Sequence, residues 1–380
     1  MSVEGIASLF PSSSSDAVVA APACSLPTVS SPTAAAGPLV ERDSIVLRLS
    51  DPDEALAGVR LATDRGFPVA AEPFAREGDG WTLRMPAPAL GRFEYALAVQ
   101  RADGEHEQWT DPANPLRAPG AFGEKSVMEL PGYAAPAWLS AERVPGHLDG
   151  LTVASSALGA ELEVAIWRPE DARDEEPLHL LVAHDGPELD QLARLTDYCA
   201  AHIAAGALPR HRVALVAPGD RDQWYSASAL YARTLANRVL PAIADVVAVR
   251  RAVGAGVSLG ALAMLHAQRR FPDVFAGLFL QSGSFFMPRF DSQESGFVRY
   301  RRIVRFVRST LREPPRRTVP VAMTVGALEE NAADNRVMAS ALAAQGYPVG
   351  LHEGRDLHNY TAWRDAWDPH LTRLLQEAWR

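Results

Sequence analysis

Lysine is nearly absent from this sequence of 380 residues, and its absence changes how the other charges are interpreted. Lys125 is the only lysine, so every other permanently charged basic side chain is an arginine. In a chain with such a general preference for arginine, a cluster of arginines is weak evidence for a binding function. The formal net charge of -9 also gives no general reason to expect nucleic acid as a partner.

Cysteine and long apolar runs are scarce as well. Cys24 and Cys199 are the only cysteines and lie far apart in unlike surroundings, which argues against a disulfide framework and a cysteine metal site. No apolar run is long enough to span a bilayer. The composition, 47% hydrophobic and 22% charged, is that of a soluble globular protein. We expect no membrane association, no metal and no cofactor.

Residues 1–39 contain no lysine or arginine, so they lack the basic start of a secretory signal. They are rich in serine, alanine and proline, and they lack both the positive segment and the apolar segment that such a signal needs. This composition is typical of disorder. We therefore predict a disordered leader over residues 1–39 and a cytoplasmic location.

From residue 40 to residue 134 the sequence has the pattern of an all-β domain. Short segments with alternating or apolar side chains are separated by glycine, proline and aspartate, and no helical pattern of useful length interrupts them. The expected strands are 44–50, 58–63, 80–87, 93–100 and 125–131. This spacing predicts an N-terminal β-sandwich domain over residues 40–134.

From residue 135 to residue 380 the pattern changes to alternating strands and helices. Short apolar runs, most of them ended by a polar or glycine turn, are expected to form strands at 162–169, 178–186, 212–220, 252–256, 277–283, 319–327 and 348–354. Helical patterns lie between them, at about 188–205, 226–247, 260–271, 332–345 and 361–378. This alternation predicts a doubly wound, mostly parallel sheet, whose functional sites form at the carboxyl ends of the strands.

Ser258 stands in a G-x-S-x-G sequence between one of these strands and a helix. The motif is short, and alone it is also compatible with a structural serine in a glycine-rich loop. A strand before it and a helical pattern after Gly260 match a nucleophile elbow, in which the serine occupies a strained turn. A Cβ at either flanking glycine, Gly256 or Gly260, would collide with the adjoining strand or helix. We therefore predict that Ser258 is a nucleophile.

A nucleophilic serine needs a histidine base and an acid that orients it. Four histidines follow Ser258, namely His266, His352, His358 and His370, and only His358 lies in a loop between the last strand and the last helix. The acid is expected after the strand at 319–327, where Glu329 comes first and Glu330 is the alternative; Asp334 has the pattern of the next helix. We predict Glu329.

The order of several motifs resembles that of the esterase D-type α/β-hydrolases. These motifs are "DG" at 185–186, "R..WY" at 221–225, "GVSLGALAML", "SGSFF", "GALEENAADNR" and "LHNYTAWR". The subgroup that the chain resembles most is the enterochelin esterases, and the likeness includes their N-terminal early-set immunoglobulin-like sandwich. The resemblance implies a serine esterase that opens the lactone of a ferric catecholate siderophore in the cytoplasm.

Carried over by residue, the resemblance makes Ser258 the nucleophile, His358 the base and Glu329 the acid. It also implies the backbone N–H of Leu259 as an oxyanion donor, and substrate contacts from four residues: Asp185, Arg221, Trp224 and Tyr225. The second oxyanion donor stays open, because Pro187 has no N–H where relatives often supply one. Gly186, Glu188 or a side chain can take that place.

Residues 297–317 form an arginine-rich segment with helical spacing. Arg301, Arg305, Arg308 and Arg312 recur every three or four residues, opposite an apolar stripe, which predicts an amphipathic helix with a basic face. The simple interpretation is a solvated face. The alternative is a cationic rim of the active site that attracts an anionic substrate.

Three other functions are compatible with the motifs. A carbohydrate esterase acting on feruloyl or acetyl esters and a sugar acyltransferase use the same catalytic groups, while a binding protein can keep the scaffold without catalysis. In all but the last case the expected partner is a small-molecule ester.

Overall fold

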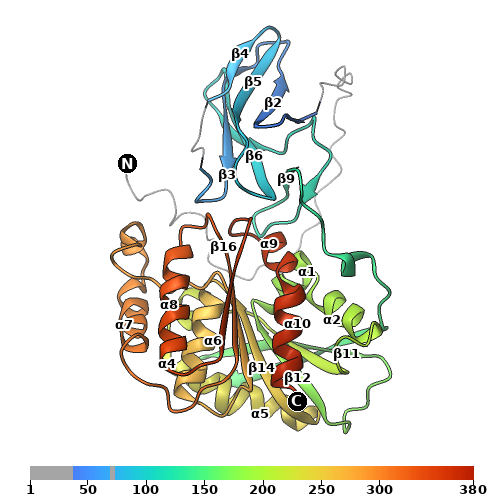
Figure 1. Ribbon diagram of the computed structural model, residues 1–380, viewed down its shortest axis with the longest axis vertical. Helices are drawn as coiled ribbons and strands as arrows, with labels where there is room; N and C mark the ends of the chain where they lie inside the picture. Colours follow the sequence, from blue (N-terminus) through green and yellow to red (C-terminus); the bar gives the residue numbers. More distant parts are fainter. Residues whose placement is uncertain (1–36, 69–72) are drawn as a thin grey trace.

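A computed structural model describes residues 37–68 and 73–380 (Figure 1). The predicted leader lies outside the described residues except for 37–39, and so does Cys24. In the described chain, an upper part built of β-strands stands on a lower part in which helices surround a sheet (Figure 1). The predicted boundary between residues 134 and 135 stays a prediction; the last upper strand ends at Glu129, and the first lower one starts at Gly146.

The upper part consists of two antiparallel sheets that share one apolar core. The first has the order β1 (Leu39–Val40), β2 (Ser44–Ser50), β5 (Gly80–Pro86) and β4 (Ala75–Glu77). The second has the order β3 (Leu56–Thr63), β6 (Arg92–Arg101), β9 (Lys125–Glu129) and β8 (Arg117–Ala118), with β7 (His106–Trp109) paired to β6. Inward-facing side chains such as Leu47, Leu83 and Phe93 fill the space between the sheets. The predicted sandwich is confirmed.

The lower part is built on an eight-stranded sheet. Its order is β10 (Gly146–Ser155), β11 (Ala160–Pro169), β13 (His211–Val216), β12 (Leu178–His184), β14 (Val249–Val257), β15 (Gly277–Gln281), β16 (Val321–Gly326) and β17 (Val349–Gly354). The pairs β10–β11 and β11–β13 are antiparallel, and all later pairs are parallel. Every residue of β12 is buried, because helices cover both faces of a parallel sheet. The predicted α/β-hydrolase architecture is confirmed.

Helices cover both faces of this sheet, which divides its core into two clusters. One face carries α4 (Ala229–Thr234), the π-helix η3 (Leu235–Val239), α5 (Leu240–Val246), α6 (Leu259–Arg270), α7 (Tyr300–Thr310) and α8 (Ala332–Ala344). The other carries α1 (Gly186–Ala193), α2 (Leu195–Ala204), α9 (Tyr360–Asp365), α10 (Trp367–Ala378) and the short 3-10 helix η2 (Ala137–Ser140). In the described chain, none of these helices could cross a membrane.

Three predicted helices are interrupted. The segment 188–205 is divided at Arg194, whose φ of 66° is left-handed, and 361–378 is divided at Ala366. The segment 226–247 contains η3, and a separate short helix, α3 (Arg221–Tyr225), precedes it. Apolar periodicity continues through such breaks because each piece buries the same face, so periodicity alone does not locate them.

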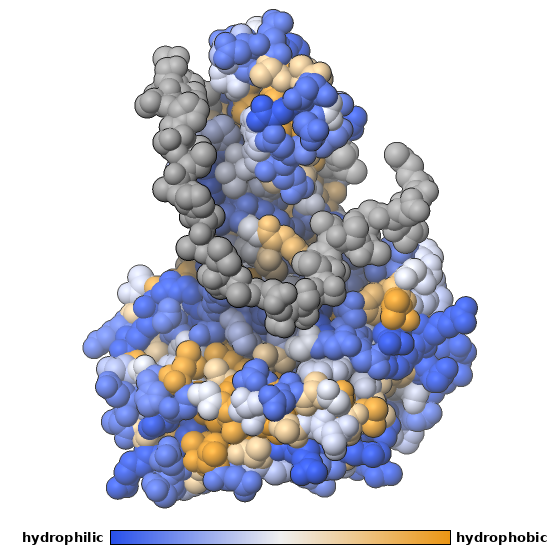
Figure 2. Space-filling view, turned by 180° about the vertical axis from the view of Figure 1, so that it is seen from behind, coloured by the Kyte–Doolittle hydropathy of each residue, from blue (hydrophilic) through white to orange (hydrophobic). Residues whose placement is uncertain are grey.

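The outer surface differs between the two parts. From behind, hydrophilic side chains cover most of the upper sandwich, whereas apolar side chains gather over the lower part (Figure 2). The exposed large apolar residues of the lower part include Leu148, Leu230 and Val246. Apolar atoms contribute more than half of the accessible surface of a typical folded protein, so this exposure needs no special function.

Candidate active site

Ser258 occupies the sharp turn between β14 and α6. Its φ of 54° and ψ of -121° are strained for a residue with a Cβ, and α6 begins at the next residue, Leu259. Its backbone N–H donates to the carbonyl of Gln281 at 2.9 Å, and its carbonyl accepts from the N–H of Ser284 at 3.1 Å. These two hydrogen bonds tie the turn to the neighbouring strand β15 and to the loop that follows it. The order of strand, sharp turn and helix is the one expected of a nucleophile elbow.

Gly256 is required by close packing inside this turn. A Cβ built on Gly256 would lie 2.5 Å from the carbonyl carbon of Gly260, in the first turn of α6. We expect Gly256→Ala to lower the free energy of unfolding by about 3 kcal/mol, since backbone has to move. Gly150→Ala is the matched control, because a Cβ there meets nothing within 4 Å. Urea unfolding of both variants measures the difference; equal stabilities would contradict this account of the elbow.

His358 and Glu329 form a hydrogen-bonded pair. The Nδ1–H of His358 donates to Oε2 of Glu329 at 2.9 Å. The other carboxylate oxygen, Oε1, accepts from Ser282 Oγ at 2.8 Å and from the N–H of Gly326 at 2.7 Å. Burial, the largest single cause, works to lower the pKa of His358, but the charge and hydrogen bond of Glu329, together with the charges of Asp64 and Glu330, raise it above its ordinary value. The imidazole is thus oriented through Nδ1, which makes Nε2 the nitrogen for proton transfer.

Glu330, the alternative acid of the sequence analysis, points elsewhere. Its carboxylate lies 3.5 Å from the guanidinium of Arg65, which belongs to the sandwich. Burial raises the pKa of Glu330, and Arg65 opposes that rise. Of the two adjacent glutamates, Glu329 is the one that contacts the imidazole.

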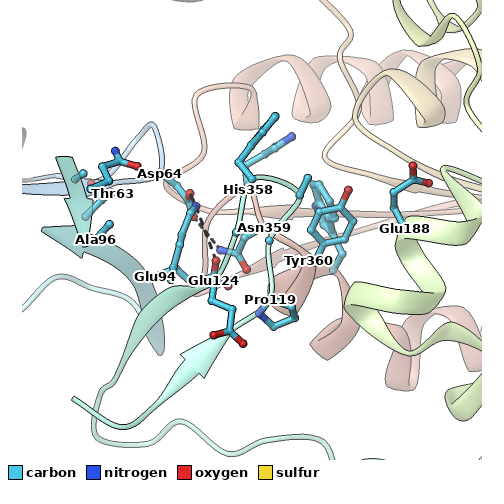
Figure 3. A pocket seen from close by; sticks show the side chains of 18 of the residues that line it. Thr63, Asp64, Glu94, Ala96, Pro119, Glu124, Glu188, His358, Asn359 and Tyr360 are labelled. Atoms are coloured by element: carbon cyan, nitrogen blue, oxygen red, sulfur yellow. Dashed lines mark hydrogen bonds and ion pairs between the residues drawn. The ribbon is translucent and has the colours of Figure 1, made fainter. Parts of the chain in front are cut away.

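A cavity of about 1260 Å³ lies between the sandwich and the lower part. Ser258 and His358 both line it, but within the described residues no hydrogen bond joins them; Ser258 Oγ instead contacts Ser284 Oγ at 3.1 Å. Catalytic hydrogen bonds are often long before substrate binds. Figure 3 shows His358, Asn359, Tyr360 and Glu188 around the cavity with Asp64, Glu94 and Ala96 of the sandwich.

The four predicted substrate-contact residues divide into two pairs. Asp185 and Arg221 line the cavity and form a bidentate ion pair, with N–O distances of 2.7 and 2.8 Å. Trp224 and Tyr225 do not line it. They are buried in the core, where Trp224 stacks on Tyr231 and Tyr225 stacks on His184. The prediction of substrate contacts for this second pair is therefore wrong, because α3 turns both rings inward.

The predicted oxyanion donors lie at two helix starts. Leu259 is the first residue of α6 and Gly186 the first of α1, so each backbone N–H is at a helix N-terminus, where negative charge is stabilised. Gly186 has a packing role too, since a Cβ there would lie 2.3 Å from the backbone of Leu215. Pro187 occupies the next position of α1 and cannot donate.

The arginine-rich segment forms the predicted amphipathic helix, α7, but it is not part of this cavity. Its exposed arginines, Arg301, Arg305, Arg308 and Arg312, line a separate hollow of about 520 Å³. Among the described residues that line the main cavity, the basic ones are Lys125 and Arg221. The hypothesis of a cationic rim from this helix is therefore wrong.

Several cavity residues were not predicted from the sequence. Asp64, Glu94 and Lys125 come from the sandwich, and Tyr360 comes from α9 of the lower part. The sandwich residues are far from Ser258 in the sequence, and no local motif points to them. In the described part of the chain, no group of three or more acidic, histidine or cysteine side chains is arranged to bind a metal.

Most of the lower part of the chain matches a known protein family. Residues 155–375, more than half of the chain, match a family model described as "Putative esterase". The chain belongs to this esterase family. No curated protein matches it at a significant level.

The most informative solved structures are enterobactin esterases. The enterobactin esterase of Shigella flexneri, solved in the presence of enterobactin, is 19% identical with a TM-score of 0.71, over 91% of this chain and 96% of that one. The ferric enterobactin esterase of Salmonella typhimurium is 20% identical with a TM-score of 0.72, over 90% and 97%. A ferulic acid esterase is 16% identical with a TM-score of 0.53, over 62% and 99%. These likenesses concern the fold.

Proposed function

We propose that this esterase hydrolyses its substrate through an acyl-enzyme on Ser258, with His358 as the base and Glu329 as its orienting acid. The observation that carries the proposal is the shared cavity. A strained serine and an imidazole already bonded to a buried carboxylate face the same space. This set of groups suits acyl transfer, since neither the serine nor the imidazole acts efficiently without the other.

In the first half of the reaction, Ser258 Oγ attacks the ester carbonyl and His358 Nε2 takes its proton. The N–H of Leu259 stabilises the oxyanion, and we assign the N–H of Gly186 as the second donor. The imidazolium then protonates the leaving alkoxide, which departs as an alcohol. In the second half, His358 takes a proton from water, which attacks the acyl-enzyme and releases the acid and free Ser258.

We further propose that the substrate is a catecholate siderophore of the enterochelin type, hydrolysed in the cytoplasm. Two observations support this choice over a sugar ester. The likeness to the enterobactin esterases extends over the sandwich, whereas the ferulic acid esterase matches only 62% of this chain. The cavity of about 1260 Å³ is also larger than a pocket for a drug-sized ligand needs to be.

The charges of the cavity bear on the iron content of this substrate. More acidic than permanently charged basic side chains line the cavity. The acidic ones are Asp64, Glu94, Glu124, Asp185 and Glu188, and the basic ones are Lys125 and Arg221. Such a balance repels a strongly anionic ferric complex more than the neutral iron-free trilactone. We therefore expect the iron-free form to have the higher kcat/KM.

Side-by-side hydrolysis tests the proposal. The substrates are a catecholate trilactone with and without iron(III), a feruloylated sugar and a short-chain chromogenic ester, and a fluorophosphonate label locates the reactive serine by mass spectrometry. We expect labelling of Ser258 and turnover of the trilactone. Turnover of the feruloylated sugar alone, or transfer to an added sugar, would replace the siderophore proposal. Labelling at another serine would overturn the catalytic assignment.

A further inference from the structure

The sandwich holds both loops that carry the candidate catalytic pair. Leu357 immediately precedes His358 and is fully buried in the apolar core of the sandwich, although it belongs to the loop after β17. Leu328 immediately precedes Glu329 and packs against the same cluster. The chain therefore anchors each loop in the sandwich one residue before the group that faces the cavity.

Backbone contacts tighten this anchoring. The N–H of Gly91 donates to the carbonyl of Arg355 at 2.7 Å, and the Arg355 guanidinium donates to the carbonyl of Leu90 at 3.0 Å. At the other loop, a Cβ on Gly66 would lie 2.1 Å from the carbonyl oxygen of Leu328, so only glycine permits this approach. The sandwich is thus fitted closely to both loops.

A buried charged cluster continues from these contacts to the residue after His358. Arg92, 1% exposed, lies 2.7 Å from Glu94 and 3.0 Å from Asp356. The same guanidinium donates to Oδ1 of Asn359 at 3.1 Å. Asn359 also caps α9, since its Oδ1 accepts from the N–H of Ala362 at 2.9 Å. Buried charges of this kind tolerate little displacement of their partners.

Asp64 brings an additional carboxylate to the cavity beside this cluster. Its Oδ2 accepts from Nδ2 of Asn359 at 3.2 Å, and its Oδ1 lies 2.5 Å from Nζ of Lys125, the only lysine of the chain. Asp64, Lys125, Asn359 and His358 all line the cavity (Figure 3 labels all of these but Lys125).

The charges around His358 come from both parts of the molecule. Glu329, in the loop after β16, contacts the imidazole, whereas Glu330 of the same loop and Asp64 of the loop after β3 act on it through their charge. Arg65 pairs with Glu330, and Lys125 pairs with Asp64, so each of these outer carboxylates has a cation of the sandwich beside it. Burial acts to lower the pKa of His358, and Glu329, Asp64 and Glu330 act to raise it.

We infer that the sandwich contributes residues to the active site and that one of them, Asp64, is a positioning residue for His358. It acts in two ways: it fixes Asn359, the neighbour of His358, and its charge stabilises the imidazolium that forms during proton transfer. Lys125 moderates this charge. The inference rests on the proposed role of His358 as the base, and it assigns to the sandwich a part in setting the basicity of that group.

Two substitutions with opposite expected effects test this inference. Asp64→Asn keeps an oxygen for Asn359 but removes the charge, so the pKa of His358 should fall by about 0.5–1 unit. The acid limb of the pH profile of kcat/KM should then move to lower pH, because His358 stays neutral at lower pH. Lys125→Met leaves the Asp64 charge unopposed and should move the limb to higher pH. Asp64→Glu should restore the wild-type limb.

The matched control is Asp53→Asn, which removes the same charge from an exposed position of the sandwich and should leave the limb unmoved. Titration of the His358 imidazole by NMR gives the pKa without any substrate, and thermal melts show whether each variant is folded. If Asp64→Asn and Lys125→Met move the pKa in the same direction or not at all, the inference is wrong. If NMR shows the expected changes in the pKa of His358 but the protein hydrolyses no ester, the inference about Asp64 stands and only the proposed function is refuted.

Discussion

Replacing Ser258 with alanine is expected to reduce kcat for ester hydrolysis at least about 10³-fold while KM changes little. Serine and alanine have the same Cβ, so the strained turn at φ 54° is no more costly in the variant than in the wild-type protein. What is lost is the oxygen that attacks the ester. The residual rate comes from the oxyanion donors and from binding alone.

The measurement is steady-state and burst kinetics with a chromogenic ester, compared with wild-type protein. Ser340→Ala is the control, because it removes a hydroxyl from an exposed position of α8. It should leave kcat unchanged. An acyl-enzyme burst that persists in Ser258→Ala would show that another residue is the nucleophile, and a binding protein without catalysis would show no burst in either form.

Glu329→Gln should lower kcat by about 10³-fold or more, on the precedent of triad acids changed to amides. The carboxylate accepts three hydrogen bonds, from His358, Ser282 and the N–H of Gly326. An amide offers one oxygen and an NH₂ group that cannot accept, so at least one donor loses its partner. If that donor is His358 Nδ1–H, the imidazole adopts the wrong tautomer and no longer accepts the serine proton.

The pH dependence of Glu329→Gln adds a second readout. Glu329 is the group that raises the pKa of His358 most, so its removal lowers that pKa. Because His358 acts as a base in its neutral form, the acid limb of the residual activity should move to lower pH. Kinetics from pH 4 to pH 9 would measure both effects.

Glu330→Gln is the matched control for this experiment. It makes the same chemical change one residue away, at a side chain that contacts Arg65 and not the imidazole. We expect kcat within about threefold of wild type, as for a partly exposed ion pair. A larger loss in Glu330→Gln than in Glu329→Gln would exchange the roles of the two residues.

The candidate site could be predicted from the sequence where its chemistry is local. Strand, glycine, serine, glycine and helix follow one another around Ser258, and a single turn of backbone holds them together. The close approach of Gly256 to Gly260 is a property of that turn. His358 could be placed because loops after strands of a parallel sheet open at one edge.

Other parts of the prediction failed for want of three-dimensional information. The sequence of the "R..WY" segment is compatible both with side chains that line the cavity and with side chains buried in the core. The turn of α3 directs Arg221 to Asp185 but buries Trp224 and Tyr225. In the same way, the sequence shows a helical stripe of arginines but not where the helix packs. In the fold, the arginines of this segment line a hollow separate from the main cavity.

By itself, the sequence determined the two architectures, the elbow with its serine and a short set of candidate partners, because these depend on periodicity and on neighbours along the chain. Only the tertiary structure decided which glutamate meets His358 and brought Asp64 and Lys125 of the sandwich to the cavity. The physical reason is that Coulomb and hydrogen-bond interactions depend on distance in space. Asp64 and Asn359 are 295 positions apart in the chain and 3.2 Å apart in the fold.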